Sequence, residues 1–174
     1  EFTYEYSDTS INYGTKTVTI KFSVADKYFK TSKLTTDTTA SNITVTADGK
    51  EVKNDTKQRK SLTKKDITAT IDGTSKKIGE EYTLELTNLD EGEGGDYSGI
   101  VKLTFAEGTV TDQSDNKSIT KIITIGIDDP TNDPGHNSGV IVDVVSPVWK
   151  IGAKSVDNTN KLVTVELIAT DKYL

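Results

Sequence analysis

The sequence predicts an all-β fold, namely a β-sandwich with one complete domain followed by the first strands of a second repeat. Three observations support this prediction. Short segments alternate apolar and polar residues with a period of two, which is the pattern of strands with one buried face. Turn-forming residues separate these segments, and no helical period or βαβ alternation is present. Finally, one of the alternating segments occurs twice in the chain.

The repeated segment covers residues 17–29 and returns, without a gap, at residues 162–174. The two copies are 145 positions apart and share the tripeptide Asp-Lys-Tyr at 26–28 and 171–173. The apolar residues Val18, Ile20 and Phe22 match Val163, Val165 and Leu167. Self-similarity at a fixed spacing indicates a tandem array, so we expect a repeat unit of 145 residues.

About eight strands are expected before the second copy begins. The turns Asp48-Gly49 and Asp72-Gly73 each predict a tight hairpin, because this dipeptide tolerates the left-handed backbone that such turns require. The strands are predicted at 3–6, 17–24, 43–47, 67–71, 82–86, 101–105, within 108–117, and at 119–127.

The domain boundary is predicted from composition. All three prolines of the chain, Pro130, Pro134 and Pro147, fall in one window that follows the last predicted strand. Such clusters of turn formers without apolar periodicity are typical of linkers. We therefore predict a domain at 1–128, a linker at 129–139 and the first part of a second repeat at 140–174. We expect that the second repeat is cut short at residue 174, and the alternative is that this incomplete repeat pairs with a partner.

Charge and composition exclude several classes of protein. The net charge of −6 and the pI near 4.9 argue against nucleic acid or an anionic membrane as the main partner. The absence of cysteine excludes disulfides, thiolate metal sites and cysteine nucleophiles. No apolar run approaches the roughly 18 residues that a membrane-spanning helix needs, and the start of the chain carries no secretory signal pattern.

Residues 107–117 carry a resemblance to a known family. Their order of Gly108, a short Val/Thr strand, Asp112 and then Asn116 resembles the late hairpin of bacterial Ig-like (Big-type) repeats. Asp115 stands where that family favours glycine, and the preceding strand at 98–105 is similar to the family as well. The resemblance implies an Ig-like sandwich of Greek-key type, from a large secreted or wall-bound bacterial protein such as an adhesin, stalk or surface-layer (S-layer) protein.

The resemblance further implies a structural protein without catalytic residues, located at the bacterial cell surface or in the cell wall. We expect a spacer, stalk or surface-layer lattice element whose partners are neighbouring repeats of the same protein. One alternative is an adhesive module that binds a glycan or host protein through loops such as the acidic loop 90–96. Another is a filament subunit in which residues 140–174 complete the sheet of a neighbour by strand addition.

Calcium is the one cofactor that the sequence suggests. Four side chains at the predicted linker could supply oxygen ligands to Ca²⁺, namely Asp128, Asp129, Asn132 and Asp133. A bound ion at this place could stiffen a string of domains. Their spacing matches no dedicated calcium loop, and a solvated acidic turn is the simpler interpretation.

A second oxygen cluster lies in the late hairpin. Asp112, Asp115 and Asn116 could also hold a cation, or their side chains could cap the backbone of their own turn. His136 has no Ser, Cys or second His near it in the sequence, so neither catalysis nor zinc binding is expected of it.

A covalent Lys–Asn or Lys–Asp crosslink, as found in pilin-like modules, would need a carboxylate beside the reacting groups. Glu85 follows Tyr82 and Leu84 in a box that is similar to the one used there. Its register is shifted by one residue, which predicts that Glu85 points away from the face carrying Tyr82 and Leu84.

The basic run at 57–60, together with Lys64 and Lys65, stands out in an acidic chain. It could dock an anionic cell-wall polymer or the acidic loop of a neighbour, or it could be a solvated hairpin whose lysines discourage edge pairing. Trp149 and Tyr173 could stack on a sugar, although packing in a core or between domains is the commoner use of such residues.

Overall fold

The structure is a computed structural model that describes residues 1–36, 40, 42–89, 97–126 and 142–172. Every regular element in these residues is a β-strand. The strand ladders in this part are antiparallel, which confirms the all-β prediction. With no helix among these residues, there is none that is long and apolar enough to cross a bilayer. The chain divides into two compact units, Glu1–Val144 and Val145–Leu174.

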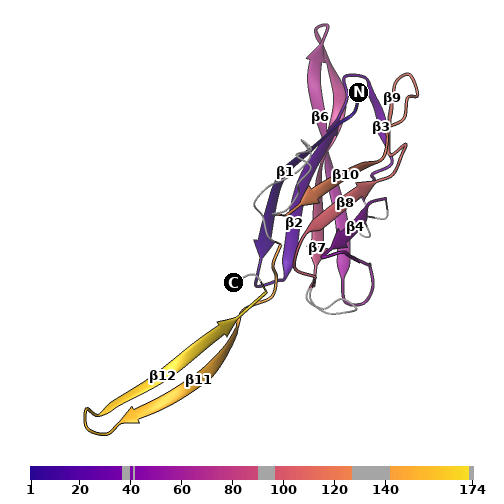
Figure 1. The fold of residues 1–174 in the computed structure, drawn as a ribbon. Helices are drawn as coiled ribbons and strands as arrows, with labels where there is room; N and C mark the ends of the chain where they lie inside the picture. The colour runs from indigo at the N-terminus through magenta and orange to yellow at the C-terminus, as the bar shows by residue number, and fades with distance from the viewer. Residues whose placement is uncertain (37–39, 41, 90–96, 127–141, 173–174) are drawn as a thin grey trace. The chain divides into compact units, whose positions relative to one another are not determined.

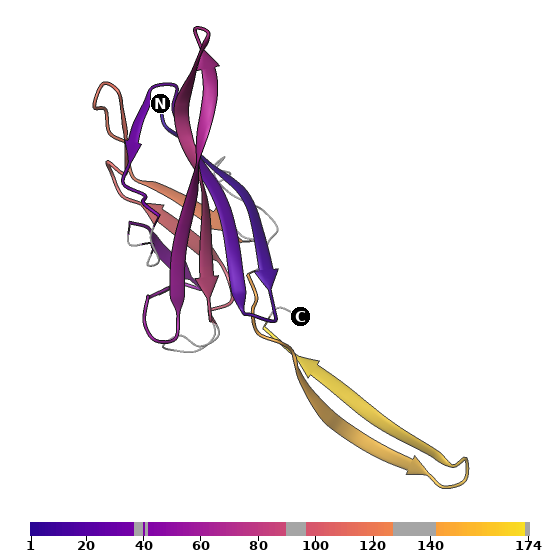
Figure 2. The same ribbon diagram turned by 180° about the vertical axis from the view of Figure 1, so that it is seen from behind.

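The first sheet of the first unit has four strands, and the strand β2 lies inside it. Its order is β1 (Thr3–Asn12), β2 (Thr17–Ala25), β7 (Thr74–Thr87) and β6 (Arg59–Ile71). The four strands lie side by side in Figure 2. The strand β2 therefore has one neighbour on each edge, β1 and β7.

The second sheet of the first unit also has four strands, in the order β10 (Lys121–Ile125), β8 (Val101–Phe105), β4 (Thr44–Ala47) and β5 (Lys50–Glu51). A separate pair is formed by β3 (Phe29–Ser32) and β9 (Val110–Asp112). Figure 1 shows the two four-stranded sheets facing each other.

Aromatic side chains join the two sheets into a β-sandwich. The ring of Phe105, on the second sheet, lies 5.1 Å from the ring of Tyr4 and 5.2 Å from that of Phe22, both on the first sheet. Every second residue of β2 from Val18 to Val24 is fully buried. The predicted alternation of that strand is thus confirmed, and burial of this apolar face against a second layer is the main stabilising contribution.

Both predicted Asp-Gly turns are present. Asp48 and Gly49 have φ angles of 50° and 74°, and Asp72 and Gly73 have φ angles of 50° and 75°. Two successive left-handed residues give the turn whose twist matches that of the paired strands. The first turn joins β4 to β5 and the second joins β6 to β7.

The second of these hairpins extends further than its sheet. The strand β2 stops pairing with β7 at Gly79, whereas β6 and β7 stay paired up to Ile71 and Thr74. The residues Ile67, Ala69 and Ile71 alternate as the sequence indicates, yet they are only half-buried. The reason is that the two strands continue there as a ribbon, without β2 beside them (Figure 2).

The second unit is a hairpin of β11 (Val148–Asp157) and β12 (Leu162–Thr170). The observed division falls between Val144 and Val145, whereas the sequence placed the second repeat from residue 140. Val142 and Val144 are fully buried in the first unit, where Gly99 N–H donates to the Val142 carbonyl at 2.8 Å. The predicted linker 129–139 lies outside the described residues.

Candidate interaction site

The hairpin β11–β12 has the same strand limits as the hairpin β1–β2. A shift of 145 residues carries Thr3–Asn12 onto Val148–Asp157 and Thr17–Ala25 onto Leu162–Thr170. The spacing predicted from the sequence therefore relates two segments with the same secondary structure.

The pairing of the strands is repeated as well. The outermost pair Thr3–Ala25 matches Val148–Thr170, and the pair next to the turn, Asn12–Thr17, matches Asp157–Leu162. Each hairpin also has one shift of register, after Tyr6 in the first and after Ile151 in the second. A bulge at the same place bends and twists both hairpins at equivalent positions.

The two turns are built in the same way. Asn12 Oδ1 accepts hydrogen bonds from the backbone N–H groups of the residues two and three positions later, at 3.0 and 3.1 Å. Asp157 Oδ1 accepts the equivalent bonds at 2.9 and 3.0 Å. Lys16 and Lys161 both adopt a left-handed backbone, with φ angles of 54° and 56°. Short Asx side chains favour such turns because they satisfy the local backbone.

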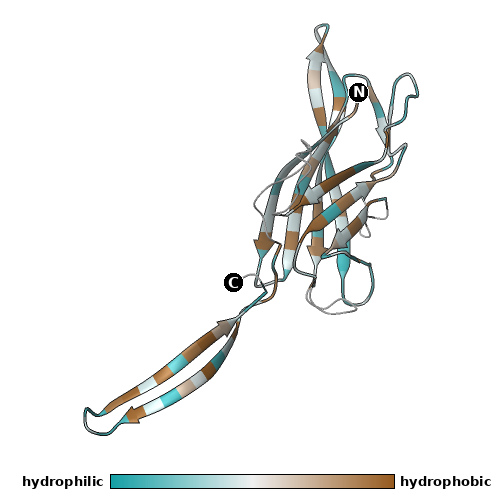
Figure 3. Cartoon of the chain, in the orientation of Figure 1, coloured by the Kyte–Doolittle hydropathy of each residue, from teal (hydrophilic) through white to brown (hydrophobic). Residues whose placement is uncertain are grey.

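The two hairpins differ in what covers them. Tyr4 is 8% exposed, whereas its counterpart Trp149 is 68% exposed. On β2, Phe22 is fully buried, whereas its counterpart Leu167 on β12 is 67% exposed. Figure 3 shows hydrophobic bands along both strands of the second hairpin. We call the face carrying Trp149, Ile151, Val156, Val163, Val165 and Leu167 the open face.

The edge of β12 is uncovered as well. In the first unit the second edge of β2 pairs with β7 from Thr87 to Gly79. In the second unit β12 pairs with β11 alone, within the part of the chain that the structure describes. An unpaired strand edge presents free N–H and C=O groups that can pair with another strand. A two-stranded hairpin is also only marginally stable in water without further strands or a covering layer.

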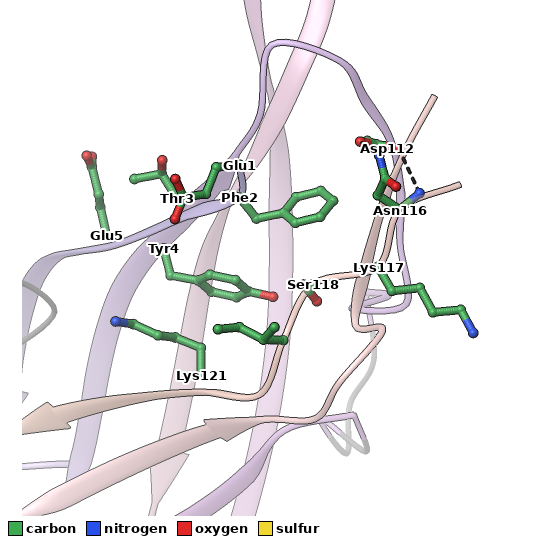
Figure 4. Close-up of a pocket in the computed structure, with 11 residues that line it drawn as sticks. Glu1, Phe2, Thr3, Tyr4, Glu5, Asp112, Asn116, Lys117, Ser118 and Lys121 are labelled. Carbon is green, nitrogen blue, oxygen red and sulfur yellow. Dashed lines mark hydrogen bonds between the residues drawn. The ribbon is translucent and has the colours of Figure 1, made fainter. Parts of the chain in front are cut away.

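A groove of about 710 Å³ lies at the other end of the first hairpin, in the first unit, between the start of β1 and the loop after β9. The side chain of Tyr4 points toward Ser118 there (Figure 4), and within the described residues its buried hydroxyl group makes no well-aligned hydrogen bond. Burial raises the pKa of Tyr4 above its ordinary value of 10.0, an effect that Ser118 partly opposes. A raised pKa keeps the phenol neutral, and a neutral phenol is a weak nucleophile.

A buried carboxylate that the sequence analysis did not single out lies on β7. Glu80 is 2% exposed, and its Oε1 accepts hydrogen bonds from Lys64 at 2.9 Å and Lys77 at 2.6 Å. Its other oxygen accepts a hydrogen bond from the Tyr82 hydroxyl. Burial alone would raise the pKa of Glu80, but the hydrogen bonds from Lys77, Tyr82 and Lys64 hold it below the ordinary value of 4.5.

The hydrogen-bond network around Glu80 continues from Tyr82 to Ser32. The Tyr82 hydroxyl and Ser32 Oγ are hydrogen-bonded at 2.9 Å. The pKa of Tyr82 is strongly raised, mainly by burial and to a smaller extent by the hydrogen bond to the Glu80 carboxylate. An ionised carboxylate with both oxygens occupied is a poor general acid or base. The sequence did carry a signal, since Glu80, Tyr82 and Leu84 are spaced by two and must share one face of β7.

The crosslink hypothesis fails on geometry at Glu85. Tyr82 and Leu84 are fully buried, whereas Glu85 is exposed on the opposite face of β7. This confirms the predicted register. The buried carboxylate beside Tyr82 is Glu80, and both of its cationic partners form ordinary ion pairs with it.

The basic run does not form one solvated patch. Arg59 is exposed, but Gln58 and Lys60 are buried, and Lys64 pairs with Glu80. Burial lowers the pKa of Lys60, with Glu51 opposing the shift. Because alternate residues of a strand face opposite sides, a run of cations in the sequence is divided between the two faces of β6.

The late hairpin shows the capping arrangement rather than an open cation site. Asp112 Oδ1 accepts hydrogen bonds from the N–H groups of Ser114 at 2.8 Å and Asn116 at 2.9 Å. Asp112 Oδ2 accepts a third from the Asn116 side chain at 2.8 Å (Figure 4). The Asp115 carboxylate pairs with Lys30 at 2.5 Å. These oxygens therefore already have protein donors.

The predicted calcium ligands Asp128, Asp129, Asn132 and Asp133 lie outside the described residues, as do His136, Tyr173 and the acidic loop 90–96. Among the residues that the structure does describe, no group of three or more His, Cys, Asp or Glu side chains could hold a metal ion. A calcium titration of the unfolding temperature tests the linker prediction, and an unchanged midpoint would remove it.

Comparisons with family models, with curated proteins and with solved structures found no significant match to this chain. The function is therefore inferred from the internal repeat, that is, from the comparison of the hairpin β11–β12 with the hairpin β1–β2. This comparison identifies the uncovered hairpin β11–β12, with its open face and the free edge of β12, as the candidate interaction site.

Proposed function

We propose that this chain is a non-catalytic structural repeat of a bacterial cell-surface protein, acting as a spacer, stalk or surface-layer lattice element. In this proposal the sandwich is Ig-like with a Greek-key connection, and its partners are neighbouring copies of the same repeat. The proposed bacterial and extracellular setting rests on the resemblance of residues 98–117 to bacterial Ig-like repeats.

One observation carries the proposal, namely the repetition of the β1–β2 hairpin as β11–β12 with the same limits, register, bulge and turn. Such agreement supports a second copy of the same fold following the first. Arrays of this kind work through geometry, because each sandwich buries its own core and the linkers set the reach of the whole.

The experiment is to lengthen the array. Chains that carry one, two or three additional copies of residues 1–145 ahead of the natural chain are compared by small-angle X-ray scattering. A spacer is expected to gain a constant increment of maximum dimension with every copy. As a control, Pro130 and Pro134 are replaced by glycine in each linker, which should shorten the average extension because Gly-rich linkers are flexible. A maximum dimension that does not grow with copy number would contradict the proposal.

A second candidate, a filament subunit assembled by strand addition, is favoured by the free edge of β12 and by the open face. In that case residues 140–174 complete the sheet of another molecule. Size-exclusion chromatography with light scattering separates the two functions. A chain that stays monomeric at high concentration contradicts strand addition between molecules.

A further inference from the structure

The strand β12 is the counterpart of β2, and the structure shows what β2 requires on its second edge. There β7 runs antiparallel to β2 in an uninterrupted ladder from Thr87 to Gly79. Its residues Tyr82, Leu84 and Leu86 are fully buried on the inner face of the sheet. The rings of Phe22 and Tyr82 stack across the two strands at 5.0 Å.

The register carries these contacts over to the second hairpin. Tyr82, Leu84 and Leu86 lie opposite Phe22, Ile20 and Val18, whose counterparts on β12 are Leu167, Val165 and Val163. These three residues of β12 belong to the open face. A strand that pairs with β12 must therefore bring an apolar side chain at every second position, in order to extend that face.

Gly79 adds a stricter requirement. A Cβ atom at this position would lie 2.3 Å from the Val24 carbonyl oxygen and 2.9 Å from Ala25 Cα, and both are backbone atoms. No rearrangement of side chains can relieve such a contact. Because the hairpin backbone is repeated, we expect the same close approach opposite Thr170, the counterpart of Ala25.

We propose that the free edge of β12 binds the second repeat's own counterpart of β7. This partner is an antiparallel strand with glycine opposite Thr170 and apolar residues opposite Leu167, Val165 and Val163. The inference rests on the proposed function, since it assigns the partner of the hairpin within the array.

A second copy of the chain fits this edge less well. Its β7 already pairs with β2 on one edge and β6 on the other, so it could be donated only by opening a complete core. Its own β12, Leu162–Thr170, contains no glycine to place against the backbone. The glycine of β11, Gly152, already has Glu166 against it, with the carboxylate oxygen 2.3 Å from where a Cβ would lie.

The test supplies the missing strand on a tether. A flexible Gly/Ser linker after Leu174 carries a copy of residues 79–87, the part of β7 that pairs with β2. The tether raises the effective concentration of the strand to the millimolar range, which compensates for weak pairing. Two matched controls carry the same tether, one with Gly79→Val and the other with L84S and L86S in the appended copy.

Hydrogen exchange of the β12 amides is the first readout. The native tether is expected to slow their exchange by at least about tenfold, and both controls are expected to leave it at the level of the untethered chain. Equal exchange in the native and control tethers overturns the proposal. If the chain without the tether dimerises and its β12 amides are protected, the proposal is also overturned, because the partner of β12 is then a second copy of the chain.

The register provides an independent readout, because the chain contains no natural cysteine. A cysteine in place of Val165 is expected to form a disulfide with a cysteine at Leu84 of the appended strand at least about ten times faster than one in place of Val163. Equal rates contradict the proposed register. The scattering experiment on lengthened arrays does not depend on this strand, so failure here is distinguishable from failure of the spacer function.

Discussion

The substitution Gly79→Ala is expected to destabilise the first unit severely, because it adds one methyl group where two backbones nearly touch. The new Cβ would meet the Val24 carbonyl oxygen at 2.3 Å and the backbone and side chain of Ala25 at 2.9 and 3.0 Å. Contacts under 3.0 Å are essentially never seen for real Cβ atoms. The strands β2 and β7 would have to separate by about 0.7 Å to relieve the shortest contact.

The magnitude follows from what that separation disturbs. Overpacking a well-packed core costs about 1–3 kcal/mol, and a lost backbone hydrogen bond adds about 1 kcal/mol. Val24, beside the contact, is fully buried, so its backbone cannot relieve the overlap by moving outward into solvent. We expect a total loss of about 3 kcal/mol in the free energy of unfolding of the first unit.

The assay is urea unfolding followed by far-UV circular dichroism, with the single tryptophan, Trp149, reporting separately on the second unit. The matched control is Gly73→Ala. Gly73 has a φ of +75° but no atom within 4 Å of a Cβ, so only backbone strain of about 1 kcal/mol is expected. If Gly79→Ala costs no more than Gly73→Ala, the close approach of β2 and β7 is refuted, together with the glycine requirement inferred for the partner of β12.

Three further predictions concern other parts of the fold. Glu80→Gln removes the charge that two lysines neutralise and should cost about 2 kcal/mol at pH 7. Because the pKa of Glu80 is lowered on folding, its contribution is complete above about pH 4.5 and is lost as the pH falls further. Urea titrations should therefore show the gap between the two proteins closing below that pH, and a constant gap would contradict the ion-pair account. Phe105→Ala removes a fully buried ring that packs from the second sheet against Tyr4 and Phe22 of the first, and calorimetry should show a loss of about 3–5 kcal/mol. Asp157→Ala should speed amide exchange at Thr159 without changing the unfolding temperature of the first unit, whereas Asn12→Ala, its matched variant, should act on the first turn.

The repeat and the local geometry could be predicted from the sequence. The self-match at 145 residues predicted that 162–174 would behave like 17–29, and the strands, register and turn of the two hairpins agree. The Asp-Gly pairs predicted two tight turns, and alternation predicted the inner face of β2. These features depend on local chemistry, because turn type and strand faces follow from residues that are close together in the chain.

The candidate site was predicted in part. The sequence indicated that the second repeat would be incomplete and could complete the sheet of a neighbour. The structure singles out β12, because the edge that is unpaired in β12 among the described residues is the edge that β7 covers in its counterpart β2. The requirement for glycine opposite Thr170 was not foreseeable, because it comes from the distance between the backbones of β2 and β7.

Which residues share a face could be predicted from the sequence, whereas which faces are covered depends on the packing of strands that are distant in the chain. Ile67 and Ile71 alternate as clearly as Val18 and Ile20, yet the first pair is half-exposed on a ribbon and the second is fully buried. Glu80 lies on an inner face because its spacing requires it, but one of its two lysine partners, Lys64, is brought to it by the folding of β6 along β7. The physical reason is that a period of two fixes the direction of a side chain relative to its own strand, whereas burial depends on a second layer contributed by residues far away in the chain.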